Sequence, residues 1–325
     1  MNSLSPNLFD GIRLANLEKQ LGLRQIHVYQ EGFGEVEHAF RASTRENLYS
    51  GSKTYTALAI GMAEAEGRLK LDELLIDFFP EFVEEQEMGK QQGSVPEGFD
   101  KVTLRHLLHM HSGKAEGFFR EKSVHGKEGS KLASAEQEDY AARFFAEGLD
   151  HAPASRFAYN NLNSYMLGRV IHKVSGENLR EYLIPRLFAP QGIANPQWDS
   201  CPRGFNMGAS GLRLKTSEYA KLGRLLLQEG EWEGQQLVPA DYIRRMHEDI
   251  VPTKDVELLP ETTQGYGYQL WICTHPQSYR ADGMYGQFSL VYPVERLVIT
   301  LTAHNEDAPY NLIAEVNKEI LPRLG

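Results

Sequence analysis

Patterns typical of β-strands lie near the two ends of this 325-residue chain, and helical periodicity dominates the residues between them. Near the N-terminus, residues 25–30 and 37–41 form two β-prone runs around a glycine turn, which predicts a hairpin. Near the C-terminus, residues 266–274, 279–293 and 296–303 are predicted to be three successive strands. We therefore expect a mixed α/β (α+β) fold, in which both ends of the chain build one antiparallel sheet flanked by helices.

The middle of the chain is predicted to be mainly helical, because apolar residues recur there at intervals of three and four. We expect residues 1–70 and 207–325 to form an α/β sheet domain and residues 71–206 a helical subdomain, with the active site between them. Residues 84–100 and 117–134 are predicted to be loops. The predicted helices cover about 50–67, 102–113, 138–147, 159–176, 179–188, 216–230, 239–246 and 310–324, and an N-terminal helix through Leu8, Ile12, Leu14, Leu17 and Leu21.

Composition narrows the classes of partner. The chain has 34 Lys and Arg against 44 Asp and Glu, a net charge of −10, and no basic block, which argues against nucleic acid and anionic membranes. A small-molecule or peptide-like substrate is the expected partner. No apolar run reaches membrane-spanning length and the N-terminus lacks a signal-peptide pattern, so a cytoplasmic location is expected. The two cysteines, Cys201 and Cys273, indicate neither a disulfide framework nor a metal knuckle.

Ser50 and Lys53 form the single Ser-x-x-Lys pair in the sequence and stand at the start of a predicted helix. Residues three apart share a helix face, so the serine hydroxyl and the lysine amine should meet as a nucleophile and its base. The positive end of the helix favours negative charge on the serine oxygen. Catalysis also needs burial to lower the pKa of Lys53 from about 10.4. The alternative is a serine that caps the helix and an ordinary helix lysine.

Two further motifs follow in order, Tyr159-x-Asn161 and the glycine-rich segment 281–287. Together with Ser50-x-x-Lys53, they resemble the motifs of the serine β-lactamase and penicillin-binding-protein superfamily, in particular its class C-like branch of esterases and D-amino-acid peptidases. The resemblance covers nearly the whole chain. Supporting stretches are 66–72, 102–108, 112–113, 167–168 and 211–226.

The resemblance implies a role for each matching residue. Ser50 would be the acylated nucleophile, Lys53 its base and Tyr159 the proton carrier to and from the leaving group and water. Asn161 would hold the substrate amide. The oxyanion hole would consist of the backbone N–H groups of Ser50 and Gln287, since preorganised donors of this kind contribute about 10²–10³ in rate. No cofactor is implied.

The third motif departs from the family pattern. β-Lactamases and transpeptidases have Lys-Thr-Gly there, whereas Met284, Tyr285 and Gly286 occupy the place here and are expected to contact the substrate. The cation that meets a substrate carboxylate is therefore missing, which implies weak or no β-lactamase activity. Arg280, four residues earlier on the same predicted strand, is an alternative source of positive charge.

Three other hypotheses compete with this one. An α/β-hydrolase would need Gly-x-Ser-x-Gly, which the sequence does not contain. His106, His109 and His111 could suggest zinc, but neither His-Glu-x-x-His nor a matching carboxylate pattern accompanies them, so no metal site is expected. The serious alternative is a catalytically silent protein of the same fold that binds a partner. The oligomeric state is not predicted by the sequence.

Overall fold

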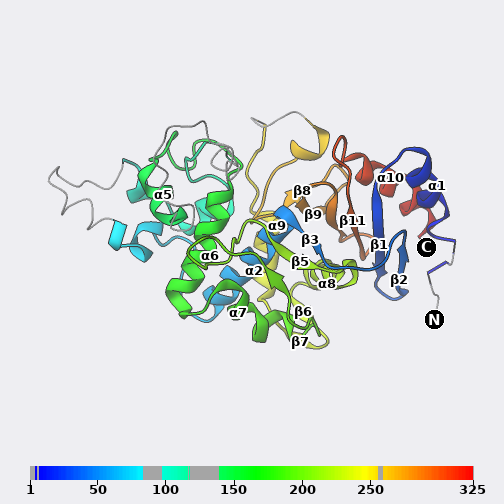
Figure 1. The fold of residues 1–325 in the computed structure, drawn as a ribbon, viewed down its shortest axis with the longest axis horizontal. Coiled ribbons are helices and arrows are strands. Elements are labelled where there is room, and N and C mark those ends of the chain that lie inside the picture. Colours follow the sequence, from blue (N-terminus) through cyan, green and yellow to red (C-terminus); the bar gives the residue numbers. More distant parts are fainter. Residues whose placement is uncertain are drawn as a thin grey trace.

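Both ends of the chain contribute strands to one six-stranded antiparallel sheet, as the sequence predicts (Figure 1). The computed structural model describes residues 4–5, 7–82, 97–115, 117, 139–254 and 259–324. The predicted loops at 84–100 and 117–134 lie largely outside these residues. In the order β2-β1-β11-β10-β9-β8, the strands are Gly34–Ala39, Leu23–Gln30, Leu297–Ala303, Gln287–Tyr292, Tyr279–Gly283 and Trp271–Ile272.

The central pairing of the sheet joins β1 to β11, with Val28 opposite Ile299. Helix α8 (Thr216–Leu227) packs on one face, where Gly223 lets it approach Val298 closely. On the other face, an apolar cluster joins the sheet to α1 (Asp10–Glu18) and α10 (Asn311–Glu319). Because both faces are covered, the central strands are apolar and buried nearly throughout.

The helices lie at the ends of the sequence and in the segment between the strands. Polar side chains cap several of them, including Thr103, Asp139, Asn160 and Asn178. The remaining helices are α2 (Ser52–Ala65), α4 (Leu104–Leu108), α5 (Tyr140–Ala146), α6 (Asn161–Ser175), α7 (Leu179–Leu183) and α9 (Ala240–Glu248). Short strands β3 (Glu46–Asn47), β4 (Gln197–Trp198) and β5 (Leu212–Leu214) form a second sheet, and β6 (Glu231–Trp232) and β7 (Gln235–Gln236) a third.

Helix α2 is the buried centre of the molecule. All its residues from Ser52 to Ala63 are buried, and it packs against α6 and α7. Figure 1 shows α2 between the sheet at one end of the molecule and α5 and α6 at the other. A helix packed on every side holds its first turn rigidly, and that turn carries the predicted nucleophile. The predicted division into two domains stays a prediction.

The structure corrects two of the predicted elements. Residues 279–293 are not one strand, because the chain reverses at Met284, where Tyr285 and Gly286 have φ of 66° and 94° and connect β9 to β10. Helix α1 forms where predicted, but Leu14 and Leu17 are 55% and 79% exposed. Its buried contacts come from Ile12 and Ala15 instead, since nine helical residues place only a narrow stripe against the sheet.

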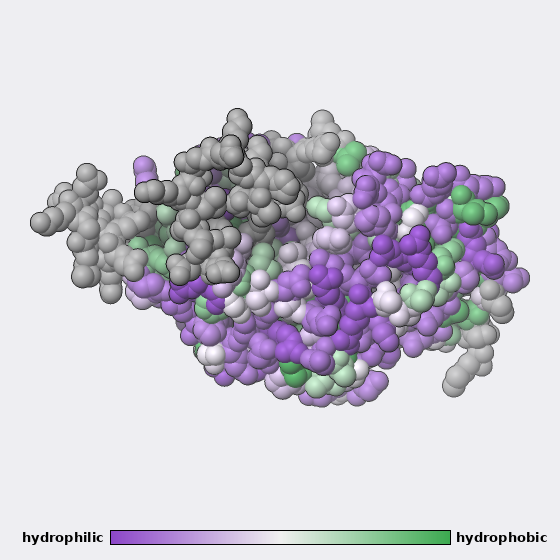
Figure 2. All heavy atoms as spheres, in the orientation of Figure 1, coloured by the Kyte–Doolittle hydropathy of each residue, from purple (hydrophilic) through white to green (hydrophobic). Residues whose placement is uncertain are grey.

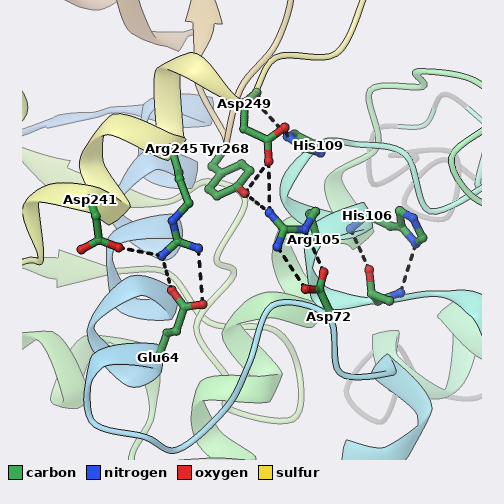
Figure 3. Close-up of polar contacts among 10 residues, drawn as sticks. Glu64, Asp72, Arg105, His106, His109, Asp241, Arg245, Asp249 and Tyr268 are labelled. Carbon is green, nitrogen blue, oxygen red and sulfur yellow. Dashed lines mark hydrogen bonds and ion pairs between the residues drawn. The ribbon is translucent and has the colours of Figure 1, made fainter.

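A cluster of charged side chains ties the helical part to α9 (Figure 3). Arg105 on α4 donates to Asp72 at 2.9 Å and to Asp249 at 3.1 Å, and it also hydrogen-bonds Tyr268. A neighbouring ion pair joins Arg245 of α9 to Glu64 of α2 at 2.6 Å. These contacts hold together segments that are distant in sequence.

The face in Figure 2 is mainly hydrophilic over the described residues, with hydrophobic side chains in small separate spots. This surface suits a chain with 24% charged residues. Among the described helices, none is both long and apolar enough to cross a membrane.

Candidate active site

Ser50 and Lys53 lie together at the start of α2, as their spacing predicts. Residues Tyr49–Gly51 form a single 3-10 turn that leads into the helix. Lys53 Nζ donates to Ser50 Oγ at 2.9 Å, and Ser50 remains partly accessible. Tyr49 has a φ of 47°, which is a strained conformation for a residue other than glycine. The strained residue immediately before the serine is typical of a functional turn.

Lys53 is almost completely buried, at 1% exposure. Its ammonium has two hydrogen-bond acceptors, Ser50 Oγ and the carbonyl oxygen of Ala209 at 2.8 Å. Burial lowers the pKa of Lys53 from its ordinary value to about 7, against an opposing contribution from Asp282. The amine is therefore neutral in a large fraction of molecules near pH 7, as a general base must be.

Tyr159 completes a group of three side chains. It hydrogen-bonds the Ser50 side chain, and Lys53 Nζ lies 5.0 Å from the centre of its ring. Trp271 stacks on the ring at 5.7 Å, and Tyr266 meets it edge-on at 6.0 Å. Burial raises the pKa of Tyr159 above its ordinary value, so the phenol keeps its proton near neutral pH. A protonated phenol beside the serine can donate to a leaving group.

Asn161 is the first residue of α6, which packs against α2. The side chain that caps the helix belongs to Asn160, whose Oδ1 accepts from Leu162 N at 2.8 Å. Asn161 is therefore free of the capping role. Its backbone N–H donates to Gly117 O at 3.1 Å, and its buried Oδ1 has no hydrogen-bond partner in the described part of the chain. The predicted contact of Asn161 with the substrate amide stays a prediction.

The glycine-rich segment reaches the nucleophile through the end of β9. A side chain on Gly283 would collide with the carbonyl oxygen of Leu48, two residues before Ser50, so only glycine permits this contact. In the following turn, the Tyr285 ring packs edge-on against Tyr49 at 5.2 Å. Met284 is 45% exposed.

Gly286 and Gln287 lead from the turn into β10. Gly286 packs against Leu312 of α10, where any side chain would collide. Gln287 opens β10, which lies between β9 and β11, and its Nε2 donates to Met284 O at 3.1 Å and Ala303 O at 2.7 Å. Gln287 thus supports the turn with its side chain, while Gly283 is the glycine that approaches Leu48, two residues before Ser50.

The alternative role of Arg280 as a substrate-binding cation is wrong. Its side chain is fully buried, and its Nε donates to Asp282 Oδ2 at 2.8 Å. Its NH2 nitrogen donates to Glu261 O at 3.0 Å. The argument from strand alternation fails as well, because β9 ends at Gly283 and Met284 belongs to the turn.

Sequence reasoning missed three contributors to the site: Ala209, Trp271 and Asp282. Ala209 acts through its backbone carbonyl, which has no sequence signature. Trp271 and Asp282 come from neighbouring strands and meet the site only through tertiary packing. Only Asp282 had a sequence signal that could have found it, namely a charged residue directly before the motif glycine Gly283.

Two of the three histidines that suggested zinc make other contacts. His106 Nδ1 accepts from Thr103 N at 3.2 Å in a capping box, and His109 Nε2 contacts Asp249 O at 2.9 Å. Within the described ranges, no group of three His, Cys, Asp or Glu side chains could hold a metal ion.

Comparison with known proteins finds similar sequences and similar structures. Protein flp of Staphylococcus aureus (strain COL) is 27% identical over 154 residues, which cover 47% of this chain and 28% of that relative's length. The octameric penicillin-binding protein homologue from Pyrococcus abyssi is 20% identical, with a TM-score of 0.72 over 97% of this chain and 77% of that chain. EstCE1, a hydrolase with promiscuous acyltransferase activity, is 15% identical, with a TM-score of 0.72 over 97% of this chain and 98% of that chain.

The two structural likenesses establish the fold, since both identities are low. The family itself is established by the sequence. A family model described as Beta-lactamase matches residues 24–317, which is most of the chain. The matched range includes the Ser50, Tyr159 and Gly283 segments. The chain therefore belongs to the beta-lactamase family.

Proposed function

We propose that this protein is a serine hydrolase that acts on an ester or amide through an acyl-enzyme. The observation that carries the proposal is the 2.9 Å contact between Lys53 Nζ and Ser50 Oγ, made by a lysine whose pKa is lowered to about 7. A nucleophile within hydrogen-bond reach of a base of suitable pKa is the arrangement that acylation requires. The expected class is an esterase or D-amino-acid peptidase.

In the acylation step, neutral Lys53 accepts the Ser50 hydroxyl proton while Oγ attacks the substrate carbonyl. The negative charge moves to the carbonyl oxygen. Tyr159 donates its proton to the leaving group, and the proton on Lys53 restores the phenol. Water then attacks the acyl-enzyme by the reverse proton path, which releases the acid and regenerates Ser50.

The oxyanion hole needs two N–H groups that converge on the carbonyl oxygen. One would be the N–H of Ser50 itself. The second predicted donor was Gln287, but the close approach of Gly283 to Leu48 favours the next residue on that strand end, Met284. We propose the Met284 N–H as the stronger candidate, because Gln287 lies on an interior strand.

We propose a small substrate that carries no negative charge close to its reactive carbonyl group. Asn161 would hold its amide or ester group, and Met284, Tyr285 and Gly286 would line the strand side. The third motif supplies no lysine, and the nearest cation on β9, Arg280, is buried in ion pairs. Binding of a penicillin-like carboxylate therefore lacks the usual charge-assisted hydrogen bond.

The alternative is a catalytically silent binding protein of the same fold. The 2.9 Å contact between Lys53 and Ser50, together with the lowered pKa of Lys53, argues against it, because a binding protein needs no neutral amine beside a serine hydroxyl.

The test is Ser50→Ala with a neutral nitrophenyl ester as substrate. We expect hydrolysis to fall at least about 10³-fold while the thermal unfolding midpoint stays nearly unchanged, since Ser50 is partly accessible and precedes the helix in a 3-10 turn. The matched control is Ser155→Ala, which removes the hydroxyl of an exposed serine outside the site. A control at Asn160 would be poor, because its side chain caps α6. Retention of most activity in Ser50→Ala would refute the nucleophile assignment.

A further inference from the structure

Residues 266–271 form a short hairpin beside the proposed proton carrier. Tyr266 and Trp271 pair with each other in an antiparallel bridge, and their rings lie 4.9 Å apart. Both rings also contact Tyr159. Trp271 stacks on the Tyr159 ring at 5.7 Å, and Tyr266 meets that ring edge-on at 6.0 Å. The two ends of the hairpin therefore hold the Tyr159 phenol ring between them.

Gln269 lies in the turn of this hairpin and has an unusual backbone conformation. The Gly267 N–H donates to Leu270 O at 3.0 Å across the turn, and Gln269 has a φ of 58°. This left-handed region is uncommon for residues other than glycine, asparagine and aspartate. Gln269 is also buried, with 2% exposure. A buried glutamine in this conformation has to be held there by the contacts around it.

The side chain of Gln269 makes such contacts with α4 and α6. Its Nε2 donates to the carbonyl oxygens of the last two residues of α4, Leu107 at 3.0 Å and Leu108 at 2.8 Å. Its Oε1 accepts a hydrogen bond from the hydroxyl of Ser164 on α6. Because the two carbonyl oxygens can only accept, the orientation of the side-chain amide is fixed, and both of its polar atoms are paired.

The backbone of Gln269 connects the same turn to α2. Thr54, the residue after Lys53, donates its hydroxyl to Gln269 O at 2.9 Å, and the Gln269 N–H donates to Leu108 O at 3.2 Å. One residue therefore joins three helices. Among these, α2 carries the proposed base, and α6 begins two residues after Tyr159.

We propose that Gln269 is a positioning residue that sets the place of Tyr159 relative to Ser50 and Lys53. Its hydrogen bonds anchor the turn of the hairpin in the helices, and Tyr266 and Trp271 hold the phenol ring at the other end. This inference rests on the proposed function, in which Tyr159 gives its proton to the leaving group. A displacement of about 1 Å in such a group can cost about 10²-fold in rate.

The test compares two acetate esters in Gln269→Met, which keeps most of the side-chain volume and removes its hydrogen bonds. Nitrophenolate leaves as an anion and needs no proton, whereas trifluoroethanol leaves only after it receives one. We expect kcat/KM to fall up to about 10²-fold for trifluoroethyl acetate but less than about threefold for nitrophenyl acetate. The readout is the ratio of the two kcat/KM values, because a merely structural loss of folded enzyme lowers both equally.

The matched control is Gln191→Met. Gln191 is also 2% exposed, and its Nε2 likewise donates to a helix carbonyl, Lys221 O at 3.2 Å, but on α8. This variant should keep the wild-type ratio. If Gln269→Met does not fold, Gln269→Gly is the second variant, because glycine adopts a left-handed φ without strain. An unchanged ratio in the folded Gln269 variant, or an equal change in Gln191→Met, would overturn the inference.

Acrylamide quenching of Trp271 fluorescence separates this inference from the proposed function, since it needs no turnover. Trp198→Phe and Trp232→Phe leave Trp271 as the sole tryptophan. Trp271 is 8% exposed, so quenching should be slow in this background and faster once Gln269→Met releases the hairpin. Faster quenching in a protein that hydrolyses neither ester would refute the proposed function and still support the anchoring of the hairpin. Unchanged quenching with an unchanged ester ratio in an active enzyme would overturn the inference and leave the serine mechanism intact.

Discussion

The charged cluster at Arg105 and the site at Lys53 differ in how the positive charge is paired. Arg105 faces carboxylates on two sides, Asp72 at 2.9 Å and Asp249 at 3.1 Å (Figure 3). The hydrogen bond from Arg105 holds the pKa of the Asp72 carboxyl below its ordinary range. Burial raises the pKa of Asp249, but hydrogen bonds from Tyr268 and Arg105 outweigh this effect, so the pKa is lowered. The pairing keeps these groups charged at every physiological pH.

Lys53 has no carboxylate within hydrogen-bond distance in the described structure. Its partners are a hydroxyl and a carbonyl, so burial dominates and the pKa falls to about 7. Lys114 shows that burial alone is not enough for catalysis. Burial lowers its pKa to about 8, and its ammonium lies 4.8 Å from the Phe144 ring, but it has no hydrogen-bond partner in the described residues. A reactive lysine needs both a lowered pKa and a nucleophile beside it.

The largest expected effect is a loss of activity that distinguishes Lys53 from Lys114. Lys53→Met should lower kcat/KM for a neutral ester at least about 10³-fold, because Ser50 loses its base. Lys114→Met removes an equally buried ammonium and should keep nearly full activity per folded molecule. Steady-state kinetics, corrected for the folded fraction, measure both. Equal losses in the two variants would contradict the distinction.

The second effect concerns stability against pH. The folded-state pKa of Lys53 is about 7 and its unfolded value is about 10.4, so the unfolded chain binds more protons between these values and stability rises with pH there. One proton corresponds to about 1.4 kcal/mol per pH unit. Asp72 and Asp249 have lowered pKa values, so the stability they add is lost only in acid and contributes no slope above pH 7.

Denaturant unfolding of wild type and Lys53→Met from pH 7 to pH 9 measures this slope. We expect the slope of Lys53→Met to be smaller than that of wild type by about one proton, with the Lys114 contribution common to both. Parallel curves would show that Lys53 is not titrating in this range.

A smaller effect is expected at the turn after β9. Met284→Lys introduces the missing cation, but residue 284 is exposed, and exposed ion pairs contribute about 0–1 kcal/mol. The ratio of kcat/KM for a chromogenic cephalosporin to that for a neutral nitrophenyl ester should rise by less than about fivefold. A hundredfold rise would show that the side chain points into the site and that a cation there is decisive.

The smallest effect is expected in the Arg105 cluster. Asp72→Asn removes a carboxylate that is 77% exposed, so the free energy of unfolding should fall by less than about 1 kcal/mol. Activity should not change. A loss of activity would link this cluster to the active site and weaken the contrast with Lys53.

The local parts of the fold and site could be predicted from the sequence. The spacing of Ser50 and Lys53 predicted their contact, and capping residues such as Thr103 indicated where helices begin. The turn at Met284 could not be predicted, because Tyr285 adopts a left-handed conformation that its residue type does not signal. The carbonyl of Ala209 reaches Lys53 only through tertiary packing, which no local pattern encodes.

The most direct test of the serine mechanism is intact-mass analysis after exposure to a fluorophosphonate. The account predicts one covalent adduct per chain, mapped to Ser50 by peptide sequencing, formed faster as pH rises through about 7, and absent in Ser50→Ala. Labelling of another residue, or no adduct with the fluorophosphonate or with activated esters, would contradict it and favour the binding protein.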